Sequence, residues 1–244
     1  MKKSYFFLFE IILLAMLSVA FVSCGGDDEE VDDAVDTTPI TLIAGNDKVI
    51  TGADTISTSN RFVAYGTKNT VHAWHVGEAT LLVNGKKSIK ITVDPLYYLY
   101  DDPICKWGCS MDYVKQNQKQ GKINSKSNSK YLIYDNAGGA TLVAYAFEDG
   151  KLSAVMTYVS TNHTSTLGSY LAERFILLPV YEGDKTRYAG TDGSIDDGSA
   201  KTYILMELYD VNTWTVYYTN INSSTRSNMP NSKIKEELMD LFNQ

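Results

Sequence analysis

Residues 131–159, YLIYDNAGGATLVAYAFEDGKLSAVMTYV, decide the fold of the second half of the chain. Three runs rich in apolar and aromatic residues are separated by the turn residues AGG at 137–139 and by Asp149-Gly150. An Asp-Gly pair between two apolar runs is the strongest short signal for a β-hairpin. The stretch therefore predicts three consecutive antiparallel strands.

Helices and further strands are expected on both sides of these three strands. Before them, Ser110 is a natural N-cap, Asp112 suits a first helical turn, and Gly121 ends a short helix. After them, apolar residues recur at helical spacing from Leu167 to Leu178, which predicts an amphipathic helix ended by Pro179. A second strand pair is expected at 201–210 and 213–220, with a C-terminal helix at 233–243. This order predicts an α+β domain over residues 105–244, with helices packed on an antiparallel sheet.

Residues 39–95 have a different pattern, in which short apolar alternations are separated by Gly, Asn, Asp and Ser. Such a pattern predicts a small all-β sandwich. In it, Gly77 makes a turn and the side chains that face inward are Val71, Ala73, Trp74, Leu82, Ile89, Ile91 and Val93. Residues 96–104, LYYLYDDPI, form a Tyr-rich linker, so two domains are expected.

Each half resembles a known family. The segments TVHAWHVGEATLLV (70–83) and SIKITV (88–93) resemble the end of a bacterial Ig-like domain of group 2. Trp107-Gly108, the short helix and residues 131–159 are similar to small envelope domains such as the β-lactamase-inhibitor protein and BamE. The second resemblance implies a module that binds macromolecules and carries no catalytic residue, an implication by fold-level analogy.

The N-terminus predicts export and a lipid anchor. Lys2 and Lys3 precede the apolar run at 11–22, which has the length of a signal-peptide core, so residues 1–23 are the expected signal peptide. The sequence FVSC resembles a lipobox, which implies that Cys24 is lipidated; the alternative is an ordinary secretory signal with a chance cysteine. Residues 24–38 predict a solvated acidic tether. The tether also looks like the export signal of Bacteroidetes surface lipoproteins, which implies a surface-exposed protein of the outer membrane.

Charge argues against nucleic acid as a partner. Without residues 1–23, the chain has 20 basic and 28 acidic side chains, and seven of the acidic ones lie in the tether between Asp27 and Asp36. The remainder is nearly neutral and has no stripe of Lys or Arg that could follow a row of phosphates.

Cys105 and Cys109 leave several alternatives open. If Cys24 is lipidated, Cys105 and Cys109 are the two cysteines that remain with free side chains, in a compartment that permits disulfides. A disulfide needs Cα atoms within about 7 Å, which a turn at Trp107-Gly108 would allow. The other readings are two buried or half-buried thiols, a reactive thiolate beside the helix N-terminus, or two ligands of a metal.

The remaining polar residues give no catalytic or metal motif. His72 and His75 lie three apart, so in a strand they point to opposite faces and are expected to face solvent beside a turn, while His163 lies in a distant loop. The loop at 192–198 holds Asp192, Ser194, Asp196 and Asp197, which could offer oxygens to Ca²⁺. It lacks the glycine at the sixth position and the distal glutamate of an EF-hand, so we expect a plain solvated hairpin loop. We expect no metal, no cofactor and no enzymatic activity.

Two binding functions fit these features. In the first, an Ig-like spacer presents the α+β head to a protein partner or host component. In the second, the head captures glycans for a nutrient-uptake system. The aromatic residues that could anchor a ligand, if exposed, are Tyr97, Tyr98, Tyr100, Trp107, Tyr217 and Tyr218. Coplanar exposed rings in a groove would indicate glycan binding, and a continuous apolar patch would indicate a protein partner.

Overall fold

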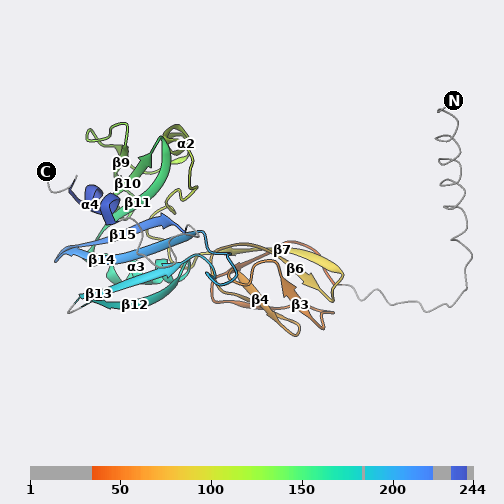
Figure 1. Cartoon of the computed structure of the whole chain (residues 1–244). Helices are drawn as coiled ribbons and strands as arrows, with labels where there is room; N and C mark the ends of the chain where they lie inside the picture. The colour runs from red at the N-terminus through yellow and green to blue at the C-terminus, as the bar shows by residue number, and fades with distance from the viewer. Residues whose placement is uncertain (1–34, 183–184, 222–231, 241–244) are drawn as a thin grey trace, which may run out of the picture. The chain divides into compact units, whose positions relative to one another are not determined.

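Strands dominate the chain from residue 35 onward. The computed structural model describes residues 35–182, 185–221 and 232–240 (Figure 1). The expected signal peptide, Cys24 and the acidic run of the tether lie outside the described residues. Val35–Gln244 form one compact unit, so the expected boundary at residues 96–104 stays a prediction. Within the described ranges, no helix has the length and apolar character needed to span a membrane.

Residues 40–94 form two small sheets around a shared apolar core. The first sheet has the order β1 (Ile40–Ile43), β7 (Lys87–Asp94), β6 (Gly77–Val83) and β3 (Ile56–Thr58). The second has the order β2 (Asp47–Val49), β5 (Thr70–Ala73) and β4 (Ala64–Thr67). β1 runs parallel to β7, and the other pairs are antiparallel. The core includes the expected Val71, Ala73, Ile89, Ile91 and Val93, all of which are buried.

Two residues expected in this core lie outside it. Trp74 is 54% exposed and Leu82 is 38% exposed. Successive side chains of a strand point to opposite faces. After Val71 and Ala73, the next inward position is therefore His75, which is 3% exposed, so the expectation that it faces solvent is wrong. In β6 the same alternation buries Leu81 and Val83 and turns Leu82 outward.

Residues 122–220 form an eight-stranded sheet, which contains the three strands predicted from residues 131–159. In sheet order the strands are β12 (Ile176–Glu182), β13 (Lys185–Thr191), β14 (Thr202–Asp210), β15 (Thr213–Asn220), β11 (Lys151–Ser160), β10 (Ala140–Glu148), β9 (Tyr131–Ala137) and β8 (Lys122–Ile123). The described pairs in this sheet are all antiparallel. Asp149 and Gly150 both have positive φ, 48° and 74°, as the tight turn between β10 and β11 requires.

The helices agree with the prediction in part: the first helix begins where expected but ends at Asn117, before the expected Gly121, and the helix expected up to Leu178 is shorter. α2 (Met111–Asn117) begins after Ser110, whose hydroxyl oxygen accepts a hydrogen bond from the Tyr113 backbone N–H at 3.2 Å. α4 (Ser232–Asp240) lies in the predicted C-terminal helix. The short 3₁₀ helix η1 (Thr161–His163) leads into α3 (Thr164–Ala172), which ends well before Pro179. The chain then continues as β12, in which Leu178 is 64% exposed, so the predicted helix was too long.

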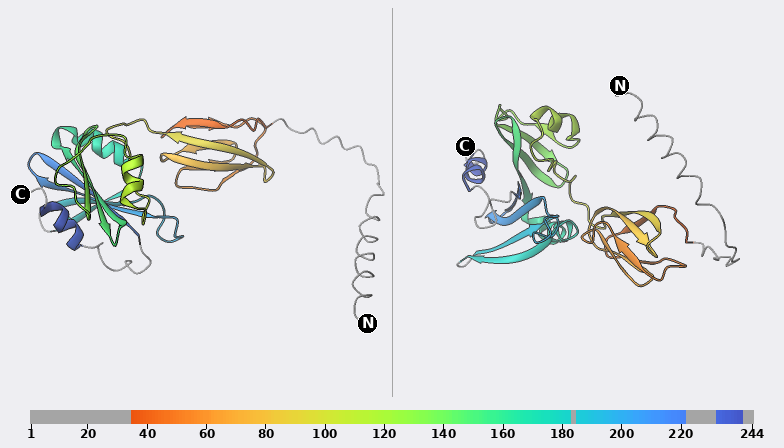
Figure 2. Two further views of the ribbon diagram at one scale, coloured as in Figure 1. Left: turned by 90° about the horizontal axis from the view of Figure 1, so that it is seen from above. Right: turned by 45° about the vertical axis from the view of Figure 1, so that its right-hand side comes forward.

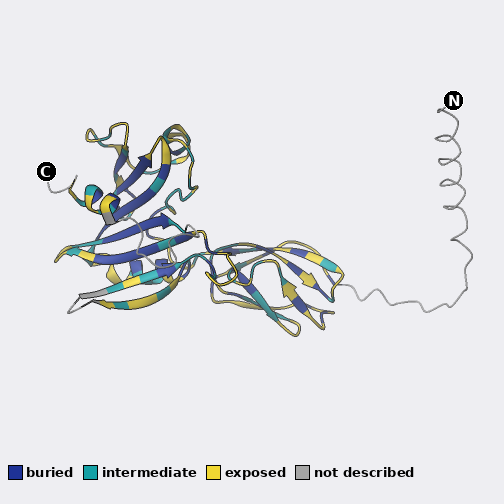
Figure 3. Cartoon of the chain, viewed as in Figure 1, coloured by how far each residue is buried: buried dark blue, intermediate teal, exposed yellow. Residues whose placement is uncertain are grey.

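Side chains are buried on both faces of the eight-stranded sheet (Figure 3). One face packs against Val114 of α2 and against Leu167, Tyr170 and Leu171 of α3. The other face packs against Ile234 and Leu238 of α4. The further views in Figure 2 show α4 on the side of the sheet away from α3. The sheet therefore has a core on each side.

Candidate functional site

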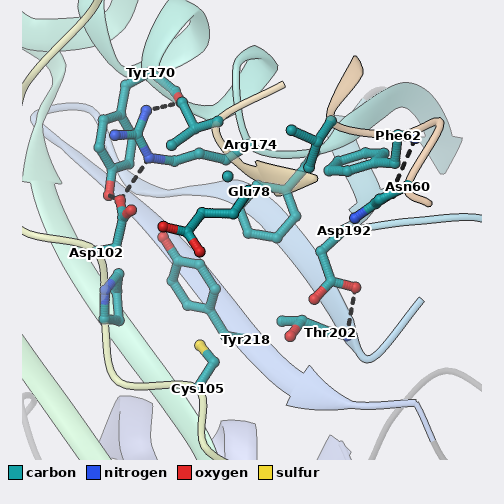
Figure 4. A pocket seen from close by; sticks show the side chains of 15 residues that line it. Asn60, Phe62, Glu78, Asp102, Cys105, Tyr170, Arg174, Asp192, Thr202 and Tyr218 are labelled. Carbon is teal, nitrogen blue, oxygen red and sulfur yellow. Dashed lines mark hydrogen bonds and ion pairs between the residues drawn. The ribbon is translucent and has the colours of Figure 1, made fainter. Parts of the chain in front are cut away.

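A cavity of about 340 Å³ lies where the two small sheets meet the eight-stranded sheet (Figure 4). Its walls combine residues before β4, the start of β6, the segment at 102–105, the end of α3, the loop after β13 and the strands β14 and β15. The lining residues are Asn60, Phe62, Val63, Val76, Gly77, Glu78, Asp102, Pro103, Cys105, Tyr170, Arg174, Phe175, Asp192, Thr202 and Tyr218.

Glu173 joins the parts of the chain that surround this cavity. Its carboxylate, in a residue only 9% exposed, accepts hydrogen bonds from the backbone N–H groups of Leu96 (3.2 Å) and Tyr97 (3.0 Å). Its backbone oxygen accepts a third from the Val76 N–H at 2.8 Å. Glu173 directly follows α3, so the end of this helix fixes both the 96–104 segment and the approach to β6.

Arg174, Asp102 and Tyr170 form a hydrogen-bonded group on one wall. Arg174 Nε donates to Asp102 Oδ1 at 2.5 Å, and the Tyr170 hydroxyl donates to the same oxygen at 2.6 Å. Arg174 Nη1 also donates to the Tyr170 backbone oxygen at 3.0 Å. The guanidinium lies 3.9 Å from the centre of the Tyr170 ring, a cation–π geometry. The group is held by several mutual contacts and has a fixed geometry.

The tyrosines of the cavity stay protonated. The hydroxyl groups of Tyr218 and Tyr100 share a hydrogen bond of 3.0 Å. Burial raises the pKa of Tyr100 to about 12 and also raises the pKa values of Tyr170 and Tyr218. At neutral pH these groups serve as hydrogen-bonding groups and not as bases.

Cys105 and Cys109 are free thiols in the structure, without the disulfide that was one alternative. A turn does form between them, because the Cys109 N–H donates to the Lys106 oxygen at 3.1 Å and Gly108 has φ of 78°. Burial, followed by the carboxylates of Asp192 and Asp102, raises the pKa of the Cys105 thiol. Burial also raises the pKa of Cys109, which is opposite to the effect expected from the helix N-terminus. The structure therefore does not favour the reactive-thiolate alternative.

In the loop at 192–198, the Asp192 side chain binds backbone N–H groups. Asp192 Oδ1 accepts hydrogen bonds from the N–H groups of Lys201 (2.7 Å) and Thr202 (2.8 Å), which anchors the start of β14. Among the described residues, no group of three His, Cys, Asp or Glu side chains is arranged to hold a metal ion. On the opposite wall, Glu78 Oε1 pairs with Lys90 at 2.9 Å.

The histidines have structural partners. His72 Nδ1 lies 2.7 Å from Asp47 Oδ1, and its Nε2 lies 2.6 Å from the Thr67 hydroxyl oxygen. His75 stacks on Phe62, with ring centres 3.9 Å apart, and its Nδ1 lies 2.7 Å from the Phe62 backbone oxygen. Burial lowers the pKa of His75. Because Phe62 lines the cavity, the stacked His75 ring fixes the position of a residue in the cavity wall.

Of the six aromatic residues considered as anchors, Tyr97 and Tyr98 are exposed. Trp107 is half-buried, and its Nε1 donates to the Thr202 hydroxyl oxygen at 3.3 Å. The other three, Tyr100, Tyr217 and Tyr218, are buried, so they are wrong as exposed anchors. The sequence reasoning missed Asp102 and Glu173. Arg174 lies within the predicted apolar stripe from Leu167 to Leu178, where a charged residue is itself a signal of a specific partner.

A search of protein-family models, of curated proteins and of solved structures finds no significant match to this chain.

Proposed function

We propose that this chain is a lipid-anchored protein of the outer membrane, exposed at the cell surface, that binds a ligand and does not transform it. In this proposal, Cys24 carries the lipid and residues 39–95 are an Ig-like spacer. Residues 105–244 are the α+β head. The contacts of Glu173 support this arrangement, because they hold the spacer side and the head side of the cavity in a defined geometry.

The observation that carries the binding function is the state of the polar groups in the cavity. The Arg174 guanidinium and the Tyr170 hydroxyl are both engaged with Asp102, and burial keeps the Cys105 thiol protonated. Catalysis needs a group that exchanges a proton or attacks the substrate near neutral pH. Groups that are already paired are suited to holding a ligand in one orientation.

A protein partner is supported by exposed apolar side chains on the hairpin formed by β12 and β13. These side chains belong to Ile176, Leu178, Tyr181 and Tyr188. Two of them are tyrosines, a residue type enriched in protein interfaces. Ile176 and Leu178 lie on one face of the hairpin and Tyr181 and Tyr188 on the other, so each face offers a pair of exposed apolar side chains to a partner.

Glycan capture for nutrient uptake is the alternative, and the cavity favours it. Carboxylates and aromatic rings line the same space, and a sugar presents hydroxyl groups together with an apolar ring face. One pair of neighbouring rings, the half-buried Tyr65 and the exposed Trp74, meets edge to face at 76° and not in the coplanar arrangement expected for this function.

Labelling with a clickable fatty acid tests the anchor. We expect wild-type protein to incorporate the label and Cys24→Ser protein to lose it, with Cys105→Ser as the matched control that keeps it. External protease added to intact cells should cleave the wild-type protein. Labelled Cys24→Ser protein, or complete protection from the protease, would contradict the proposal. Pull-down from intact cells and a glycan array then test the two ligand classes, and silence in both would count against binding.

A further inference from the structure

We propose that the cavity binds one or two rings of a saccharide, a ligand that donates several hydroxyl hydrogen bonds and lays an apolar face on aromatic rings. The proposal rests on the ligand-binding function above and names the ligand class of that site.

The cavity offers free carboxylate oxygens. Its lining holds three carboxylates, those of Glu78, Asp102 and Asp192, which Figure 4 shows on different sides of one space. One oxygen of each is engaged: Glu78 Oε1 with Lys90, Asp102 Oδ1 with Arg174 and Tyr170, and Asp192 Oδ1 with backbone N–H groups. Within the described ranges, the second oxygen of each carboxylate receives no hydrogen bond from the protein.

Some donors of the lining are used inside the protein. The Tyr170 hydroxyl donates a hydrogen bond to Asp102, and the Tyr218 hydroxyl is paired with Tyr100. Arg174 directs Nε to Asp102 and Nη1 to a backbone oxygen, whereas its Nη2 and the Asn60 Nδ2 have no hydrogen-bond partner among the described residues. A ligand that fills the cavity therefore meets free carboxylate oxygens together with free N–H donors, and hydroxyl groups can both donate and accept.

Apolar surfaces complete the lining. The rings of Phe62 and Phe175 and the side chains of Val63, Val76 and Pro103 lie among the carboxylates. The stacking of Phe62 on His75 fixes its plane. The volume of about 340 Å³ is at the lower end of the range for small-molecule sites, about 300–1,000 Å³, which suits a ligand of one or two rings.

The charges beside the cavity leave room for a competing class of ligand. Arg174 pairs with Asp102, and Lys90 pairs with Glu78. Asp192 accepts hydrogen bonds from two backbone N–H groups and keeps its charge. The apolar rings and the mixture of acceptors and donors favour a sugar, and the remaining negative charge makes organic cations the necessary comparison in the test.

The test is calorimetric titration of the full lipidated protein in a detergent without a sugar head group. The probes are N-acetylglucosamine, methyl glucoside, methyl galactoside, maltose, cellobiose and lactose, with choline and putrescine as cationic comparisons. Glycans immobilised through their reducing ends distinguish a terminal sugar unit from a free sugar. We expect at least one sugar to bind with a Kd of about 1 mM or lower.

Two conservative variants connect the binding to the carboxylates. Asp192→Asn keeps the oxygen that anchors β14 and replaces the free one by a donor, and Glu78→Gln makes the same change at an exposed residue. Each should weaken sugar binding at least tenfold, or about 1.4 kcal/mol. Asp196→Asn, in the same loop but outside the lining, should leave the affinity unchanged.

The proposal is overturned if none of the sugars binds at about 10 mM, if only choline or putrescine binds, or if both variants bind as tightly as the control. Should Asp192→Asn fail to fold, Glu78→Gln alone decides. These outcomes are independent of the lipid anchor, which the Cys24→Ser experiment tests separately.

Discussion

Replacing Glu173 by Gln should weaken the hydrogen bonds that hold Leu96 and Tyr97 beside the cavity. The substitution keeps the size of the side chain but replaces one carboxylate oxygen by an NH₂ group. One of the two backbone N–H groups that Glu173 now accepts, those of Leu96 and Tyr97, would then face a donor.

The expected loss is about 2 kcal/mol. A hydrogen bond to a charged group contributes about 1.5–3 kcal/mol, and a buried donor left without a partner costs about 1–3 kcal/mol. Because the side chains of Leu96 and Tyr97 are exposed, water reaches this segment, and we take a value in the lower part of that range. For a chain of this size, about 2 kcal/mol corresponds to a fall in Tm of about 4–8 °C.

Urea unfolding and amide hydrogen exchange measure the effect. We expect a lower urea midpoint for Glu173→Gln and faster exchange at Leu96 and Tyr97. Glu236→Gln, an exposed position on α4, is the matched control and should change the free energy of unfolding by less than about 0.5 kcal/mol. A urea midpoint equal to that of the control, with unchanged exchange at both amides, would refute the stabilising role of the Glu173 carboxylate.

Three further predictions follow from the described residues. Gly168→Ala should stabilise α3 by about 0.5–1 kcal/mol, because a Cβ there meets nothing within 4 Å. Gly66→Ala should destabilise the protein, because its Cβ would lie 2.5 Å from a backbone oxygen of β3. Thermal unfolding of the two variants compares these effects. Acidification from about pH 7 to 5 should lower the free energy of unfolding through His75. The pKa of His75 in the folded chain lies below its ordinary 6.5, so the unfolded chain binds the proton more readily. The loss of stability appears as the pH falls below 6.5 and should be smaller in His75→Gln. Alkylation of the unreduced, denatured protein should modify both Cys105 and Cys109, and native protein should react slowly at neutral pH because both thiol pKa values are raised; an unmodified pair would reveal a disulfide.

Local sequence signals predicted the strands well where turn residues bound apolar runs. The three strands of residues 131–159 and the pair at 201–220 are present, with Asp149-Gly150 as a hairpin turn. The errors arose where hydrophobicity was given more weight than alternation. The expectation that Trp74 faces the core rests on its size and aromatic character, but the bend that follows β5 turns His75 inside, where its ring nitrogen Nδ1 lies 2.7 Å from the Phe62 backbone oxygen.

The end of α3 shows a second limit of local patterns. Phe175 to Leu178 continue the helical spacing of apolar residues, but they are equally compatible with a strand, and Pro179 is tolerated in β12 because that strand lies at the sheet edge. The choice depends on distant partners. Glu173 accepts hydrogen bonds from Val76, Leu96 and Tyr97, and Ile176 pairs with Thr191.

The sequence alone determined the β-rich character of the chain, its hairpins and the start of its first described helix, because turn residues and alternation act over a few neighbouring positions. It also supplies the prediction of a lipid anchor at Cys24. Only the tertiary structure decided the cavity. Glu78, Asp102, Arg174 and Asp192 come from separate segments and have no common motif, and they share one space because the packing of the sheets and the contacts of Glu173 bring those segments together.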